Sequence, residues 1–152
     1  MSVYYIVGSN KELKNLSKLN VGFEPISSDD LKKYLKNIDF KSKYYYVSNF
    51  IMSTMIYDDV DKSLHYNFND QKTDLFNFAQ FFNNECENLN SVEFYKLWSI
   101  FDNHKENHEL NYIYNEREID IDDYNYLEEF EFNSKYIFNR KKENNLELWV
   151  EN

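Results

Sequence analysis

The sequence predicts one α+β domain over residues 1–152, in which an antiparallel sheet of mostly C-terminal strands packs against three to four short helices. A length of 152 residues suits a single domain. The hydrophobic fraction of 42%, with 19% aromatic residues, is enough for a core although the mean hydropathy is −0.78. Helical and strand-like periodicities follow each other along the chain, and neither a Pro-, Gly- or Ser-rich stretch nor an internal repeat divides it.

The N-terminal third is expected to hold one strand and two helices. The apolar run of residues 3–7 predicts the strand. Asn10 can cap a short helix, whose apolar side chains are Leu13, Leu16 and Leu19. Ser27 or Ser28 can cap the second helix, and the acids that follow are favourable near the positive end of a helix. The second helix has its apolar stripe at Leu31, Tyr34, Leu35 and Ile38.

The middle of the chain is expected to continue the sheet. Residues 43–57 are rich in Tyr, Val, Ile and Phe on both faces, which favours buried strands. Residues 58–61 would form a turn. The alternation of Leu64, Tyr66 and Phe68 with His65 and Asn67 predicts a half-buried strand.

Two further helices are expected over residues 73–89 and 91–101. Thr73 can cap the first helix, whose apolar face is Leu75, Phe78, Ala79, Phe82, Cys86 and Leu89. Ser91 opens the second, with apolar residues at Phe94, Leu97, Trp98 and Phe101. The single cysteine, Cys86, permits no internal disulfide and is expected to be a buried core thiol.

The C-terminal part is expected to supply strands. Apolar residues alternate with polar ones at Ile119 and Ile121, then in three runs around Phe132, Tyr136 and Leu148. We expect residues 128–150 to form a three-stranded antiparallel meander with turns at 133–134 and 143–145. This meander would pack on the two helices that carry Phe78, Phe82, Leu97 and Trp98.

The formal charge of −10 comes entirely from the second half of the chain. Residues 1–76 hold 10 basic and 10 acidic residues, whereas residues 77–152 hold 7 basic and 17 acidic ones. Residues 116–131 contain eight acids and one arginine, a net charge of −7. Such a surface repels phosphates and anionic lipids and attracts basic proteins, so we expect a basic protein partner and neither nucleic acid nor membrane as a ligand.

The composition argues against an enzyme. Only 2 glycines are present, which excludes the glycine-rich phosphate loop, the dinucleotide-binding turn and the nucleophile elbow. His104 and His108 have the i, i+4 spacing of zinc ligands but lack the third ligand that a catalytic site needs. Asp120, Asp122 and Glu131 match positions of a calcium loop, yet Asn125 stands where the turn requires glycine. We therefore expect no cofactor and no metal.

The candidate partner-binding residues lie where acids and tyrosines interleave. Ile119 and Ile121 would point to the core, while Glu118 and the acids that alternate with them point outward. Tyrosine supplies a large contact area at interface cores. The predicted contacts are Asp120, Asp122, Asp123, Tyr124, Tyr126 and Glu128, with Asp58, Asp59 and Asp61 of the other acidic cluster flanking them. The alternative interpretation is that these acids only solvate a strand face.

In size, its single cysteine, the absence of a catalytic motif and its acidic, Tyr-rich stretch, the chain resembles the small acidic immunity proteins of bacterial polymorphic-toxin and contact-dependent growth-inhibition systems. The resemblance implies a cytoplasmic inhibitor that occludes the basic active-site cleft of a cognate toxin, such as a nuclease or a nucleotide-using toxin. The same surface would suit a phage-encoded nucleic-acid mimic that inhibits a host defence nuclease. A small metal-dependent enzyme is the third hypothesis.

Overall fold

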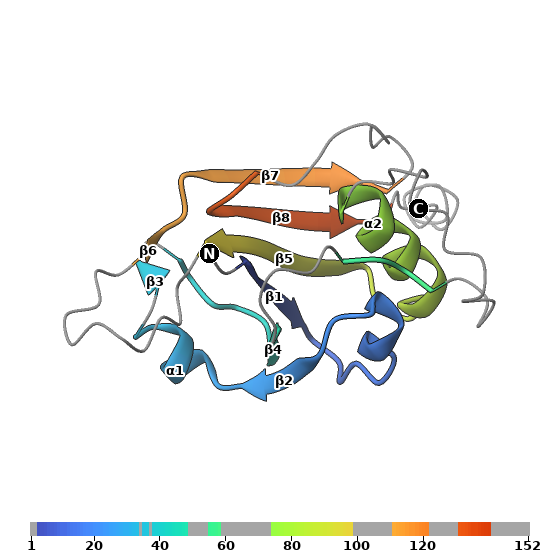
Figure 1. Cartoon of the computed structure of the whole chain (residues 1–152), viewed down its shortest axis with the longest axis horizontal. Coiled ribbons are helices and arrows are strands. Elements are labelled where there is room, and N and C mark those ends of the chain that lie inside the picture. The colour runs from blue at the N-terminus through green and yellow to red at the C-terminus, as the bar shows by residue number, and fades with distance from the viewer. Residues whose placement is uncertain are drawn as a thin grey trace, which may run out of the picture.

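The computed structural model of the chain describes residues 3–33, 35–36, 38–48, 55–58, 74–98, 111–121 and 131–140. The strands are β1 (Val3–Ser9), β2 (Phe23–Ile26), β3 (Leu35–Lys36), β4 (Tyr44–Ser48), β5 (Ser91–Trp98), β6 (Asn111–Tyr112), β7 (Asn115–Asp120) and β8 (Ser134–Asn139). The helical segments are η1, a 3-10 turn (Leu16–Leu19), α1 (Ser28–Leu31) and α2 (Asp74–Glu85). Six strands form one sheet in the order β2-β4-β1-β5-β8-β7, and β3 pairs with β6 in a separate parallel pair (Figure 1).

The sheet is antiparallel except at one edge, where β7 runs parallel to β8. Its central strands are β1 and β5, which pair in register from Val3 opposite Trp98 to Gly8 opposite Glu93. The other edge is β2, which contains the only proline, Pro25. Proline lacks the N–H that a central strand must donate, so an edge position suits it.

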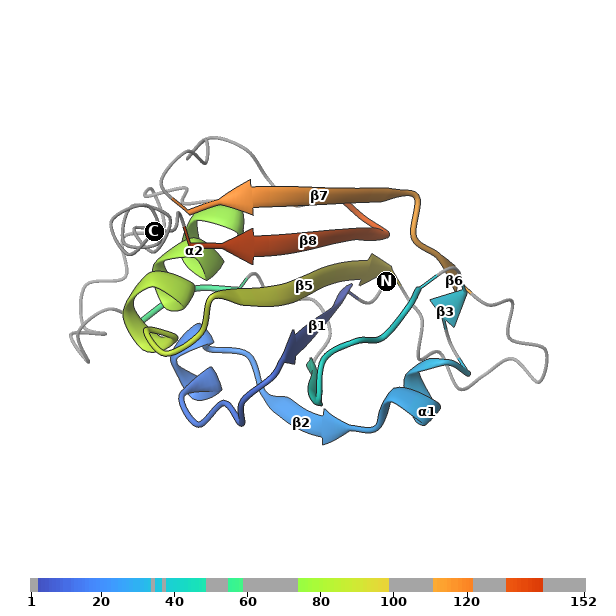
Figure 2. The same ribbon diagram turned by 180° about the vertical axis from the view of Figure 1, so that it is seen from behind.

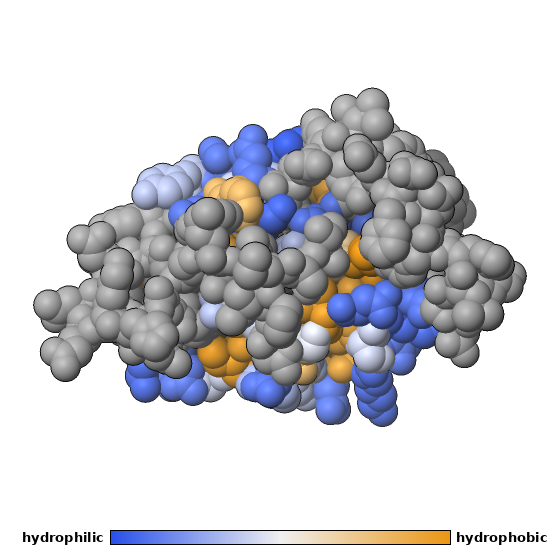
Figure 3. Space-filling view, in the orientation of Figure 1, coloured by the Kyte–Doolittle hydropathy of each residue, from blue (hydrophilic) through white to orange (hydrophobic). Residues whose placement is uncertain are grey.

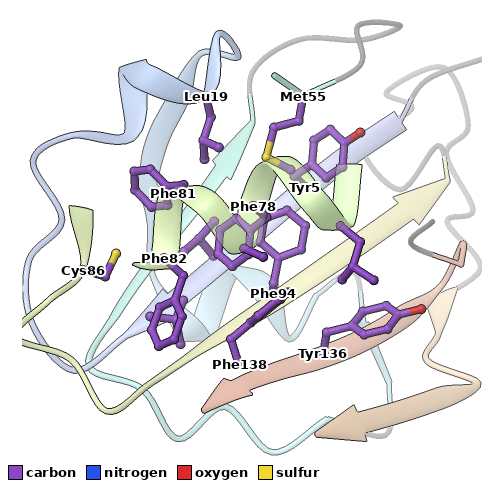
Figure 4. Close-up of a cluster of buried hydrophobic side chains, with 14 of the residues drawn as sticks. Tyr5, Leu19, Met55, Phe78, Phe81, Phe82, Cys86, Phe94, Tyr136 and Phe138 are labelled. Atoms are coloured by element: carbon purple, nitrogen blue, oxygen red, sulfur yellow. The ribbon is translucent and has the colours of Figure 1, made fainter. Parts of the chain in front are cut away.

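The larger core cluster lies between one face of the sheet and α2 (Figure 4). The Phe78 ring of α2 lies 3.8 Å from that of Phe94 on β5 and 4.9 Å from that of Phe138 on β8, measured between ring centroids. Cys86 is 3% exposed within this cluster, as predicted. The six apolar residues expected on one face of the 73–89 helix are all buried, so the amphipathic pattern correctly predicted which side of α2 packs on the sheet.

A smaller cluster covers the opposite face of the sheet, which Figure 2 shows from behind. Leu31 of α1 and Leu35 of β3 pack there with Ile6, Tyr95 and Leu97. Further along this face, the ring of Phe40 meets the ring of Tyr45 edge-on at 5.3 Å. The central strands are therefore buried on both faces.

The α+β class is confirmed, but the expected three to four helices and mostly C-terminal sheet are wrong in detail. The described residues contain two α-helices and one 3-10 turn. Three strands of the main sheet come from residues before 49 and three from residues after 90. The helix expected over 91–101 is in fact β5 where the chain is described. Val92 and Phe94 face one apolar layer and Tyr95 and Leu97 the other, so the strand shows no polar alternation.

The two N-terminal helices are shorter than expected. Ser27 does cap α1, because its hydroxyl accepts the Asp30 N–H at 3.1 Å, but α1 ends at Leu31 and Leu35 begins a strand. The first helix is reduced to η1, which ends at Asn20 in the left-handed conformation (φ 56°). Asn10 does not cap it; its side chain accepts the Lys43 N–H at 3.3 Å instead.

Other expectations for strands are met in part. Residues 3–7 lie in β1, and 44–48 of the 43–57 segment form β4, whereas 55–58 are not a strand. The strand expected over 64–68 and the cap at Thr73 lie outside the described residues. The predicted meander of residues 128–150 would place β8 between two other strands of the same segment. This prediction is wrong, because the neighbours of β8 in the sheet are β5 and β7. The residues of 128–130 and 141–150 lie outside the described part.

Candidate functional site

The acidic stretch begins as β7, the last strand of the main sheet. Ile119 and the following Ile121 are 5% and 8% exposed, while Glu116 and Glu118 are exposed and Asp120 is half-buried. From Glu118 to Ile121 this is the alternation that the sequence predicts, since side chains two residues apart share a face of a strand. Arg117, which precedes them on the face of Ile119, is exposed. Figure 3 shows hydrophilic side chains along the upper edge of the molecule, over β7. The strand therefore turns a row of carboxylates outward.

Only part of the predicted contact set lies in the described residues. Asp120 ends β7, and Asp58 donates its N–H to the carbonyl of Lys18 in η1 at 2.7 Å. Asp58 thus lies beside η1, the 3-10 turn in the connection between β1 and β2. The remaining predicted contacts lie outside the described residues; they are Asp122, Asp123, Tyr124, Tyr126, Glu128, Asp59 and Asp61.

Lys135 partly neutralises the start of the acidic row. Its ammonium lies 3.5 Å from a Glu116 carboxylate oxygen and 2.9 Å from one of Glu93. Lys135 is 7% exposed, whereas the side chain of Glu116 is 60% exposed. Glu116 therefore both compensates a buried charge and presents a carboxylate to solvent.

A buried polar network on one face of the sheet joins Lys135 of β8 to Glu93 of β5 and Tyr45 of β4. The Glu93 carboxylate accepts the hydroxyls of Tyr45 at 2.6 Å and Ser42 at 2.9 Å through one oxygen, and Lys135 through the other. Gly8 of β1 lies directly under it. A Cβ at Gly8 would lie 2.5 Å from the Tyr45 ring and 2.7 Å from the Glu93 carboxylate, so only glycine leaves space for this hydrogen bond.

The opposite face holds a second network of the same composition. Asp74, the first residue of α2, accepts the Tyr5 hydroxyl at 2.6 Å and the Lys96 ammonium at 2.9 Å through Oδ2. Its Oδ1 has no hydrogen-bond partner within the described part of the chain. Each face of the sheet thus carries one tyrosine–carboxylate–lysine set, in which the charges of lysine and carboxylate compensate each other.

Sequence reasoning missed both networks. Tyr45, Glu93 and Lys135 are 48 and 42 residues apart along the chain, and only the pairing of β4, β1, β5 and β8 brings them together. The one local signal was Gly8 inside an apolar strand, which indicates a close approach of another group. The roles of Glu93 and Lys96 were missed because residues 91–101 were predicted to form a helix. In the strand β5 these two residues lie on opposite faces, one in each network.

Burial dominates the titration of the groups around the networks. Loss of solvent, followed by the negative charge of Asp74, raises the pKa of Tyr5. Burial and the hydrogen bond to Glu93 raise the pKa of Tyr45, and burial raises that of Tyr95. Burial also raises the pKa of the Cys86 thiol to about 12. These groups therefore stay protonated near neutral pH, and Cys86 has the properties of a packing residue rather than a nucleophile.

The structure does not bring together the described residues of the metal sites considered from the sequence. The Glu131 carboxylate accepts the Asn115 side chain at 3.0 Å at the start of β7, while Asp120 lies at its end. Five residues of strand separate these positions by roughly 17 Å, too far for one calcium ion to bind both carboxylates. His104, His108, Asp122 and Asn125 lie outside the described residues. In the described ranges, no group of three His, Cys, Asp or Glu side chains is arranged to hold a metal ion.

Within the described segments, no helix combines the length and the apolar character needed to cross a membrane. The chain matches no protein-family model, no curated protein and no solved structure.

Proposed function

We propose that the protein is a non-enzymatic binding protein that docks a basic protein partner on the outward face of β7. The observation that carries this proposal is the row of Glu116, Glu118 and Asp120 on the last strand of the sheet, above the buried Ile119 and Ile121. Alternate carboxylates on a strand lie roughly 7 Å apart, so they can meet a row of lysine or arginine side chains on a partner. A rigid sheet holds this row in place before the partner arrives.

Immunity against a bacterial toxin is the specific role that we infer, with the partner's basic, substrate-binding cleft as the docking surface. Acids would pair with the Lys and Arg residues that hold phosphate in the uninhibited toxin. Opposite fields would also speed the encounter, to as much as ~10⁸–10⁹ M⁻¹s⁻¹ at low ionic strength. The protein would act in the cytoplasm, where such a toxin reaches its substrate. The contacts proposed outside the described residues, Asp122 to Glu128, belong to the same acidic stretch of the sequence.

Capture of the partner from the native cell tests the proposal if three bait proteins are compared. The bait proteins are the wild type, the double variant Glu116→Gln/Glu118→Gln, and the control Glu12→Gln/Glu87→Gln, which removes two exposed acids elsewhere. We expect a basic protein that the wild type and the control retain and that the β7 variant loses. Hydrogen exchange of the isolated complex should then show protection at 115–120. A partner retained equally by all three baits would contradict the proposal.

A further inference from the structure

Exposed aromatic side chains lie at the end of the sheet where the acidic strand begins. The described residues contain three large hydrophobic side chains with high exposure, Tyr44 at 42%, Tyr114 at 72% and Phe132 at 43%. Two of these come just before β7 and β8. The Tyr114 N–H donates to the carbonyl of Asn133 at 2.9 Å, which fixes the two segments side by side.

One carboxylate is held close to the segment that carries Tyr114. Glu131 is exposed and accepts the Asn115 side chain, so its charge is held next to the residue that follows Tyr114. Glu116 and Glu118 lie further along β7, on the face of the sheet opposite the Lys96 ammonium and the Phe132 ring. An aromatic ring attracts a cation to its face, and an arginine side chain can stack on a ring while its guanidinium meets a carboxylate.

The protein itself already uses one of these rings in this way. The Lys96 ammonium lies 4.8 Å from the centroid of the Phe132 ring and also binds the Asp74 carboxylate. On the neighbouring strand the Arg117 guanidinium lies 5.9 Å from the Tyr136 ring. Cation–aromatic contacts, one of them supported by a carboxylate, are thus built into this part of the sheet.

We propose that Tyr114 is the anchoring residue of the interface, and that it receives an arginine- or lysine-bearing segment of the basic partner with Glu131 as its counter-charge, whereas the Phe132 ring already holds the Lys96 ammonium. This inference rests on the proposed function and adds to it. Charges at the rim of an interface mainly accelerate association, whereas aromatic side chains at its core slow dissociation. The acidic row would steer the partner, and the aromatic end would hold it.

A short basic peptide tests the anchor before the partner itself has been captured. The probe is an acetylated, amidated Arg-Ser-Arg-Ser-Arg peptide, whose arginines share one face when the chain is extended; the same peptide with glutamine for arginine is the control. Titration into the 15N-labelled protein should give saturable shift changes concentrated at 114–118 and 131–134. Changes concentrated elsewhere, or no saturable binding, would overturn the proposal.

Variants at Tyr114 and at a control tyrosine test whether the Tyr114 ring is responsible for the peptide's affinity. Tyr114→Ala should weaken the peptide's Kd by about two- to fivefold, the range of an exposed cation–aromatic contact. Tyr114→Phe retains the ring and should retain the affinity, as should Tyr44→Ala, which removes a tyrosine of similar exposure to Phe132 from β4. Both tyrosines are exposed, and thermal unfolding of each variant would check that it folds.

The outcomes separate this inference from the proposed function. If Glu116→Gln/Glu118→Gln weakens binding and Tyr114→Ala does not, the anchor is wrong and the acidic docking surface stands. If Tyr44→Ala weakens binding as much as Tyr114→Ala, the peptide has no preferred site and the anchor is also wrong. If neither the acid nor the Tyr114 variant matters, both proposals fail.

Discussion

Gly8 is the residue on which the buried network of Tyr45, Glu93 and Lys135 depends. It lies in the central strand of the sheet and faces Tyr45 on one neighbour and Glu93 on the other. The strand around it is otherwise apolar, and a side chain here would enter the space of the 2.6 Å hydrogen bond between these residues. A tyrosine and a carboxylate from different strands can meet over β1 only because this position has no Cβ.

Gly8→Ala should therefore lower the free energy of unfolding, by about 1–3 kcal/mol, the usual cost of forcing extra atoms into a packed core. The measurement is urea denaturation followed by tryptophan fluorescence. Gly22→Ala is the matched control, because Gly22 is exposed and has a negative φ. It should leave stability unchanged or raise it slightly. Equal effects of the two substitutions would show that the close approach over Gly8 has no energetic weight.

At the level of elements, Arg140 fixes the end of α2 to the sheet. It follows β8 and donates from Nη2 to the carbonyls of Phe82 and Cys86, both at 2.7 Å, and from Nε to that of Leu89 at 2.9 Å. The guanidinium also lies 4.5 Å from the Phe82 ring. These carbonyls lie in the last turn of α2 and in the chain that follows it, where a cation favours the negative end of the helix dipole.

Arg140→Lys should destabilise the protein by about 1–3 kcal/mol, because a lysine has one ammonium group and cannot reach three carbonyls at once. Thermal and urea unfolding measure this loss. Arg117→Lys, at an exposed position of β7, should change stability by less than about 0.5 kcal/mol. A comparable loss in both variants would mean that Arg140 does not act through the end of α2.

The elements differ in how far the sequence predicts them. β1 and α2 were predictable because each has a pattern of its own, a short apolar run and a continuous amphipathic stripe. β5 was not, since Phe94, Leu97 and Trp98 fit a helical spacing and a strand buried on both faces has no alternation to oppose it. α1 was cut short by the pairing of Leu35 with Asn111, a contact that local sequence does not encode.

For the candidate site, the sequence correctly predicts the direction in which side chains point but not their neighbours. The outward acids and inward isoleucines of β7 follow from a period of two. That β7 is the last strand of the sheet depends on strand order, and that Asp58 lies beside η1 depends on a contact between segments far apart in the sequence. Tyr114 and Phe132 could not be selected from the 14 tyrosines and 13 phenylalanines of the chain before their exposure was known.

For the whole molecule, the buried tyrosines predict sensitivity to alkali. The pKa values of Tyr5, Tyr45 and Tyr95 are raised in the folded protein, above the value near 10 expected when the chain is unfolded. Above that pH the unfolded chain releases these protons and the folded protein retains them, so the free energy of unfolding should fall as pH rises past about 10.

Absorbance of tyrosinate at alkaline pH, followed together with circular dichroism, measures this effect. We expect Tyr5, Tyr45 and Tyr95 to ionise only as the protein unfolds. Tyrosinate formation that is complete before any loss of ellipticity would show that burial does not hold the protons.

The distribution of charge over the molecule is what links its fold to the proposed function. All of the net −10 lies in residues 77–152, which include the three strands β5, β8 and β7 on one side of the sheet. Two lysines in this half, the buried Lys135 and the largely buried Lys96, are paired with carboxylates inside the protein. Arg117 of β7 is exposed, but its guanidinium lies over the Tyr136 ring, on the face of the sheet opposite Glu116 and Glu118. The carboxylates of β7 therefore share their face with no exposed basic residue of that strand.

The most direct test is the association rate constant with the captured basic partner, measured by stopped-flow fluorescence over a range of ionic strength. The wild type and Glu12→Gln/Glu87→Gln should associate fast at low ionic strength and slow together as salt is added. Glu116→Gln/Glu118→Gln should associate more slowly at low salt, with a flatter dependence on salt. Three superimposable curves would contradict the claim that the acidic face of β7 receives the partner.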